Sequence, residues 1–378
     1  MTDHANINRV WVSTRKGLFE IIRADAESNQ WSVGRMDFMG EPVTATLHDI
    51  RGGGKGSTLY AALNLGHFGV KLHRRDDNRN AGVSAWKEIA APAYPAQPES
   101  AKNQPAWKLS LIWTLAAGGA DEPGVIWAGT MPGGLFRSRD RGDSWELIHA
   151  LWDMPQRLGW FGGGFDVPGI HSICVDPRDS KHVLIGVSCG GAWVTRDGGD
   201  TWVLSATGMR ANYMPPEQAD DGNTQDPHRI VQCRAAPDTL WCQHHGGMWR
   251  STNGGALWDE IKNVPVSNFG FAVAAHPHDD NTAWFVPAVA DQKRIPVDAA
   301  LAVTRTRDGG KTFDVLRTGL PQSQCYDLIY RHGLAVADDG RTLMMGSTTG
   351  GLWSSSDAGE TWRTISTNMP PIYAVSFR

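Results

Sequence analysis

One eight-residue pattern, Ser/Thr-x-Asp-x-Gly-x-Thr/Ser-Trp, recurs along this chain of 378 residues. Two eroded copies end at Trp31 and Trp86, and steps of 55, 59, 57, 56, 55 and 49 residues separate the closing aromatic residues of successive copies. A period of this length is typical of architectures built from one repeated supersecondary unit. The five well-formed copies read SRDRGDSW (138–145), TRDGGDTW (195–202), STNGGALW (251–258), TRDGGKTF (306–313) and SSDAGETW (355–362).

The pattern predicts a tight turn between two antiparallel strands. A carboxylate at its third position can accept backbone N–H groups across the turn, and glycine takes a positive φ without steric cost. We therefore interpret the third residue of each copy as a turn former and not as a catalytic acid. These residues are Asp140, Asp197, Asn253, Asp308 and Asp357.

Each repeat has room for four short strands, which predicts an all-β chain. The fold class that we predict is a seven-bladed β-propeller with four-stranded antiparallel blades, forming a single domain over 1–378. The first repeat lacks one strand, whereas the chain ends in IYAVSFR, an alternating strand with no partners of its own. We expect this C-terminal strand, at 372–377, to complete the first blade and close the ring, since closure removes exposed sheet edges.

Composition excludes several classes of partner. The net charge of −4 offers no basic surface for nucleic acid. No apolar run approaches the roughly 18 residues that span a membrane. The N-terminus, MTDHANINRVWV, has no secretory signal pattern, so we expect a cytoplasmic protein.

The repeats resemble the Asp-box (BNR) propellers of the sialidase-like superfamily. That group includes sialidases, xyloglucan-active glycosidases, the sortilin luminal domain and the photosystem II assembly factors. The resemblance covers essentially the whole chain and implies the propeller fold, but its members have unrelated functions. Sialidases are similar to one another in having six blades and an Arg-Ile-Pro motif before the first Asp box. Here that motif is Arg294-Ile295-Pro296, after three of the five clear copies.

Histidines gather at one predicted rim, where the turns before each third strand and the entries of each first strand should lie. Long connections at 90–107, 150–169 and 208–227, and an expanded loop at 287–300, also belong there. Long connections of this kind are often functional. The histidines assigned to this rim are His67, His171, His228, His244 and His245.

Imidazole is the commonest ligand for transition metals, so this group predicts a metal centre. The ion would be zinc, copper, iron, manganese or nickel, and no nucleotide cofactor is expected. We take Asp226, Glu217 and Lys108 as candidate catalytic residues, with Lys108 placed to bind an anionic substrate. Asp221 is a further acid in the connection that holds Asp226 and Glu217. The alternative is that the histidines bond only water and backbone at a polar channel mouth.

Three functions remain open. The first is a metal-assisted hydrolase or lyase that acts on a small-molecule substrate at the channel mouth. The second is a metal-free, sialidase-like glycoside hydrolase, which needs two carboxylates that flank a sugar. The third is a non-catalytic binding or assembly propeller. The oligomeric state is open. Carboxylates on the rim for the second function are Glu99, Asp166, Asp221 and Asp226.

Overall fold

The computed structural model describes residues 8–26, 28–51, 56–78 and 82–377. The first seven residues, and parts of the two eroded repeats, lie outside the described residues. Strands dominate and form seven sheets, six of them four-stranded and one five-stranded. The prediction of an all-β, seven-bladed β-propeller is confirmed. The chain divides into two compact units, 1–43 with 228–378 and 44–227, and both boundaries, at 43/44 and 227/228, fall inside strands. The assignment of 1–378 to a single domain stays a prediction.

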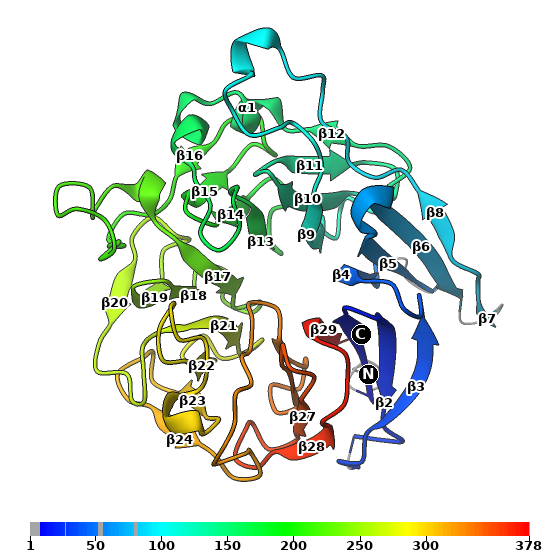
Figure 1. Ribbon diagram of the computed structural model, residues 1–378, viewed down its shortest axis with the longest axis vertical. Coiled ribbons are helices and arrows are strands. Elements are labelled where there is room, and N and C mark those ends of the chain that lie inside the picture. The colour runs from blue at the N-terminus through cyan, green and yellow to red at the C-terminus, as the bar shows by residue number, and fades with distance from the viewer. Residues whose placement is uncertain (1–7, 27, 52–55, 79–81, 378) are drawn as a thin grey trace. The chain divides into compact units, whose positions relative to one another are not determined.

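The unit formed by 1–43 and 228–378 contains four sheets. One of them joins the two ends of the chain, because the C-terminal strand pairs with the first strand in antiparallel register (Figure 1). This confirms the predicted closure by 372–377. The strands, sheet by sheet, are β29 (Ile372–Phe377), β1 (Arg9–Thr14), β2 (Gly17–Ile22) and β3 (Ser32–Asp37); β17 (Pro227–Gln232), β18 (Leu240–His244), β19 (Gly247–Ser251) and β20 (Asp259–Ile261); β21 (Gly270–Ala275), β22 (Ala283–Pro287), β23 (Val303–Thr306) and β24 (Asp314–Leu316); β25 (Leu334–Val336), β26 (Leu343–Gly346), β27 (Leu352–Ser355) and β28 (Arg363–Ser366).

The unit formed by 44–227 contains the other three sheets. One has a fifth strand, since both β7 and β8 pair with β6. The strands are β4 (Val43–Asp49), β5 (Ser57–Asn64), β6 (Val70–Asn78), β7 (Gly82–Val83) and β8 (Lys87–Ile89); β9 (Leu111–Ala117), β10 (Ile126–Met131), β11 (Leu135–Ser138) and β12 (Glu146–Leu147); β13 (Ile170–Val175), β14 (Val183–Val187), β15 (Gly191–Thr195) and β16 (Val203–Leu204).

Helical segments are short and occupy connections. None of the helices in the described part of the chain has the length and hydrophobicity needed to cross a bilayer. They are α1 (His149–Trp152) and the 3-10 turns η3 (Gly66–Phe68), η4 (Glu99–Ala101), η5 (Pro155–Gly159), η6 (Gly222–Thr224) and η7 (Val297–Ala299).

The repeated pattern forms the turn that its residues predict. In the copy at 306–313, the Asp308 carboxylate accepts the backbone N–H of Thr312 at 2.9 Å and its hydroxyl at 2.6 Å. The Gly310 N–H donates to the Thr306 hydroxyl at 2.9 Å, and Gly310 has a φ of 92°. Asn253 accepts the Leu257 N–H in the same way at 2.9 Å. The third residue of the pattern is therefore a structural acceptor.

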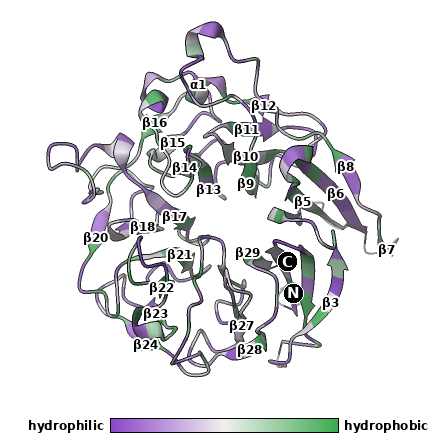
Figure 2. Cartoon of the chain, viewed as in Figure 1, coloured by the Kyte–Doolittle hydropathy of each residue, from purple (hydrophilic) through white to green (hydrophobic). Residues whose placement is uncertain are grey.

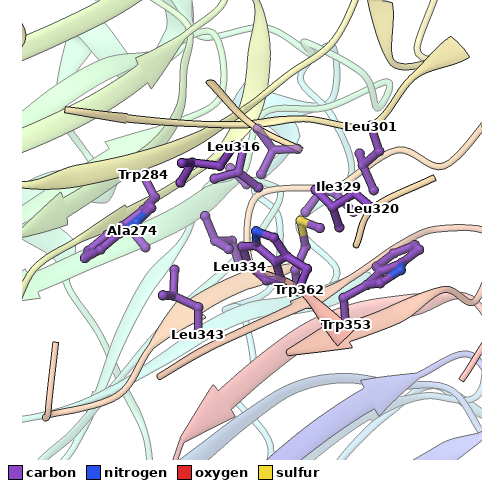
Figure 3. Close-up of a cluster of buried hydrophobic side chains, with 14 of the residues drawn as sticks. Ala274, Trp284, Leu301, Leu316, Leu320, Ile329, Leu334, Leu343, Trp353 and Trp362 are labelled. Carbon is purple, nitrogen blue, oxygen red and sulfur yellow. The ribbon is translucent and has the colours of Figure 1, made fainter. Parts of the chain in front are cut away.

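Aromatic side chains fill the space between neighbouring sheets. Figure 3 shows one such cluster in the first unit, where Trp284 comes from β22, Trp353 from β27, and Trp362 from the turn before β28. These three indoles are at most 3% exposed. Hydrophobic residues concentrate in inner strands such as β14, whereas the short strand β20 is mainly hydrophilic (Figure 2). Buried indoles thus pack together with aliphatic side chains between the sheets of this unit.

Candidate functional site

Asp226 occupies the last position before β17 and is 1% exposed. Its Oδ1 accepts the backbone N–H of Cys189 at 3.1 Å. Cys189 has a φ of 46°, an uncommon conformation for a residue with a side chain. A Cβ added to Gly163 would lie 3.0 Å from Asp226 Oδ2 and 2.6 Å from Cys189 Sγ, so only glycine fits there. The carboxylate is therefore held in a tightly packed position.

Only Pro227 separates His228 from Asp226 in the sequence, and His228 is fully buried in β17. Its Nδ1 lies 2.6 Å from the carbonyl oxygen of Gly270. A carbonyl can only accept, so Nδ1 carries the hydrogen and the neutral ring has its lone pair on Nε2. The ring stacks on Phe271 with the centroids 4.4 Å apart and an interplanar angle of 14°. The tautomer and the plane of this imidazole are thus both determined by its neighbours.

His245 belongs to the two-residue turn between β18 and β19, and it is partly exposed. Its ring centroid is 5.4 Å from that of His228, at 72°, and 5.7 Å from that of Phe269. The structure therefore brings together two of the predicted histidines, His228 and His245.

The other predicted histidines have different surroundings. His244, though adjacent to His245, is buried, and its Nδ1 accepts the Gly246 N–H at 2.9 Å, which stabilises the turn. His171 is buried in β13, with Nδ1 2.9 Å from the Ser172 hydroxyl and its ring 5.4 Å from that of Trp113. His67 is exposed in η3 and contacts Phe68 at 3.9 Å between ring centroids.

The remaining predicted residues lie on the surface. Glu217 and Lys108 are exposed in irregular segments. Asp221 caps η6 by accepting the Asn223 N–H at 2.9 Å. Glu99 forms an exposed ion pair with Lys102 at 2.6 Å. Their predicted roles in chemistry stay predictions.

Several residues around Asp226 and His228 were not predicted from the sequence. Burial, together with the nearby Asp226 and Cys189, raises the pKa of Tyr213 well above its usual range, and its hydroxyl donates to the Thr224 carbonyl at 2.6 Å. The run of glycines at 162–164 was the one available signal, since three consecutive glycines suggest close backbone approach. Nothing in the sequence marked Phe269 and Phe271 as the walls of a site.

Arg294, from the Arg-Ile-Pro motif, has structural partners. Its guanidinium donates to the Asp291 carboxylate at 2.6 Å and to the Tyr330 hydroxyl at 3.2 Å. It also lies over the Phe271 ring, 5.4 Å from the centroid. The motif therefore anchors the long loop that follows β22.

A small pocket of about 50 Å³ opens in the unit formed by 44–227. The guanidinium of Arg157 stacks on Trp152, 3.7 Å from the ring centroid, and the Trp160 indole donates to Asn223 at 2.9 Å. Both indoles are buried, with Trp152 2% and Trp160 7% exposed, and Arg157 and Gln104 make the pocket partly polar. The pocket is lined by Gln104, Pro105, Pro132, Trp152, Arg157, Leu158, Trp160 and Pro168.

Comparison with known proteins finds xyloglucanases among the relatives. A xyloglucanase of a Paenibacillus species is 23% identical over 322 residues, which cover 74% of this chain and 29% of that protein. Xyloglucanase Xgh74A of Acetivibrio thermocellus is 23% identical over 309 residues, covering 75% and 35% of the two chains. The chain thus spans about a third of the length of these curated relatives. No protein-family model matches it.

Solved structures with the same fold include enzymes and binding proteins. An ancestral GH74 enzyme superposes with a TM-score of 0.56 at 15% identity, covering 89% of this chain and 38% of that one. YCF48 bound to D1 peptide superposes with a TM-score of 0.51 at 13% identity, covering 93% and 88%. At these identities the structural likeness shows the fold alone. The chain is a seven-bladed β-propeller with xyloglucanases among its sequence relatives.

Proposed function

We propose that this chain is a glycoside hydrolase that acts on a polysaccharide and has Asp226 at its reacting centre. The observation that carries the proposal is a carboxyl group 1% exposed beside a glycine run, in a chain whose curated relatives include xyloglucanases. Among the three functions that the sequence left open, these relatives favour the metal-free glycoside hydrolase. The substrate is then a polysaccharide and not the small molecule first expected.

Glycoside hydrolysis commonly uses two carboxyl groups in different surroundings. A buried carboxyl group can supply the proton to the leaving oxygen, while a solvated carboxylate acts as base or nucleophile. Asp166 is the second group that we propose. It is exposed, and its backbone carbonyl carbon would lie 2.8 Å from a Cβ added to Gly162, next to the Gly163 that contacts Asp226. The backbone of Asp166 and the carboxylate of Asp226 therefore approach the same glycine run.

The pocket lined by Trp152, Arg157 and Trp160, in the same unit as Asp226, supports a carbohydrate ligand. Sugar rings present C–H faces that pack on indoles and hydroxyl groups that bond to arginine and amide side chains. Trp160 lines the pocket together with Trp152 and Arg157, and a Cβ added to Gly133 would lie 3.4 Å from the Trp160 ring. We assign this pocket to one sugar residue of the polysaccharide.

The test measures reducing ends released from xyloglucan and from other plant and bacterial polysaccharides. General acid–base groups typically contribute about 100-fold to 10,000-fold in rate, so D226N and D166N should each lower kcat by about 100-fold or more. The matched control is D220N, which alters an exposed ion pair with Arg210 in the same connection as Asp226. Equal activity of D226N and the unmodified chain would exclude Asp226 as the acid.

A further inference from the structure

We propose that the pocket in the unit formed by 44–227 binds the carboxylate of an acidic sugar residue through Arg157 and Gln104. The polysaccharide that the chain cleaves would then contain uronic acids. This inference rests on the proposed function and names the substrate class of the same pocket. Binding of an acidic sugar can be measured without hydrolysis, so the two proposals can fail separately.

The guanidinium of Arg157 is partly buried and has only uncharged partners among the residues that the structure describes. Nε donates to the carbonyl oxygen of Trp152, and Nη2 donates to the side-chain oxygen of Gln104 at 3.2 Å. The group also stacks on the Trp152 ring, 3.7 Å from the centroid. A cation that is partly withdrawn from water without an ionic partner has a free-energy cost, which a bound anion relieves.

The acidic groups nearest to Arg157 do not neutralise it. Burial lowers the pKa of Arg157, and Tyr94 and Asp153 oppose this effect without cancelling it. The Tyr94 hydroxyl is uncharged, because burial raises its own pKa above the usual range. The Asp153 carboxylate is exposed and lies 3.0 Å from Nδ1 of His149. The positive charge of Arg157 is therefore available to a ligand.

The amide of Gln104 presents a second donor to the pocket. Its Oε1 accepts from Nη2 of Arg157 at 3.2 Å and from the indole N–H of Trp107 at 3.4 Å. Because two donors already use the oxygen, the amide NH₂ group is left to donate to a ligand. No residue in the described lining of the pocket is acidic. The pocket therefore offers hydrogen-bond donors and positive charge, which is what a carboxylate requires.

The size of the pocket favours a carboxylate over larger anionic groups. A water molecule needs roughly 10–15 Å³ of such space, so about 50 Å³ accommodates roughly three or four non-hydrogen atoms. A carboxylate is smaller than a sulfate or phosphate ester, and its planar form matches the fork of a guanidinium. We assign the acidic group to the pocket and the rest of the sugar residue to its mouth, where Leu158 is 61% exposed.

The experiment measures binding of glucuronate and galacturonate to the whole chain by ligand-observed NMR, with glucose and galactose as the neutral counterparts. We expect each uronate to bind about tenfold more tightly than its counterpart, because hydrogen bonds between charged groups are stronger than neutral ones. Added salt should reduce this difference, since Arg157 is only partly buried. Glucose 6-sulfate is the probe for a larger anionic group.

Substitution of Arg157 tests the role of its side chain. R157Q should remove the preference for uronates, whereas R157K should keep part of it, because lysine retains the charge without the planar fork. R210Q is the matched control, because Arg210 is an exposed arginine of the same unit that pairs with Asp220 at 2.7 Å.

A measurement on the unmodified chain does not depend on the folding of any variant. A polysaccharide rich in glucuronate is compared with its carboxyl-reduced form, in which each carboxylate is replaced by a primary alcohol. Reduction should lower kcat/KM for cleavage by about tenfold or more, since it removes the charge-assisted hydrogen bonds to the pocket.

The outcomes separate the acidic-sugar site from the glycosidase. Equal binding of uronates and neutral sugars, or an unchanged preference in folded R157Q, overturns the site. Tighter binding of glucose 6-sulfate than of glucuronate overturns the assignment to a carboxylate. A chain that binds uronates through Arg157 but cleaves no polysaccharide upholds the site and removes the proposed function. Cleavage that carboxyl reduction does not slow removes the acidic substrate class and leaves the glycosidase standing.

Discussion

At the scale of single residues, hydrogen bonds within the repeated turns lower the pKa values of the acceptor carboxylates. The side-chain hydrogen bond from Thr312 lowers the pKa of Asp308 to about 2 from an ordinary value of 3.8. The corresponding hydrogen bonds also lower the pKa values of Asp140 and Asp197. These carboxylates favour the folded state only while they are ionised.

A pH dependence follows from the lowered pKa of Asp308. Because the pKa is lower in the folded chain, the contribution to stability is present above about pH 4 and is lost as the pH falls toward 2. D308N should keep the turn, as Asn253 does in its own repeat, and should lose less stability over this interval than the unmodified chain. Thermal midpoints measured between pH 2 and 7 test this.

D308A is the companion variant, because alanine removes the acceptor and not only the charge. It should be less stable than D308N at pH 7. If the thermal midpoint of D308N falls with pH as steeply as that of the unmodified chain, the Asp308 carboxylate does not contribute to the pH dependence of stability.

The packing between neighbouring sheets decides stability at the scale of elements. Trp284, from β22, is fully buried, and its indole N–H donates to the Ala358 carbonyl at 2.8 Å in the turn before β28. This side chain thus connects the third and fourth sheets of its unit both by packing and by a hydrogen bond.

Trp284→Ala should lower the free energy of unfolding by about 3–5 kcal/mol, the usual range for a large buried aromatic residue. Chemical denaturation followed by circular dichroism measures this loss. Leu257→Ala is the control, since Leu257 is 45% exposed and surface changes usually stay within about 0.5 kcal/mol. A loss below about 1 kcal/mol would mean that neighbouring side chains fill the space.

The pairing of the chain's two ends is the feature that matters at the scale of the whole molecule. Strand β29 pairs with β1 over five residue pairs, from Val10 with Phe377 to Thr14 with Ile372. Ile372 and Val375 also belong to the buried cluster around β1 and β2. Without β29, the first strand would be an exposed hydrophobic sheet edge.

A chain that ends at Asn368 should therefore unfold at a lower temperature and self-associate during size-exclusion chromatography. A synthetic peptide that spans 369–378, added in trans, should restore part of the thermal stability by pairing with β1. An unchanged midpoint in the shortened chain would show that closure contributes little.

The sequence by itself determined the turns, the blades and the closing strand. The hydrogen bonds of each repeated turn join residues at most four positions apart, so a short stretch of sequence predicts them. The first blade lacks one strand, so it requires a strand from the other end of the chain. The sequence predicted that five histidines share one rim, but it did not predict which of them lie close together. Only the tertiary structure decided that His228 lies beside His245, whereas His244 accepts a hydrogen bond within its own turn and His67 is exposed. The physical reason is that strand pairing places His228 beside His245, while the position of Asp226 depends on the positive φ of Cys189 and on the absent side chain of Gly163.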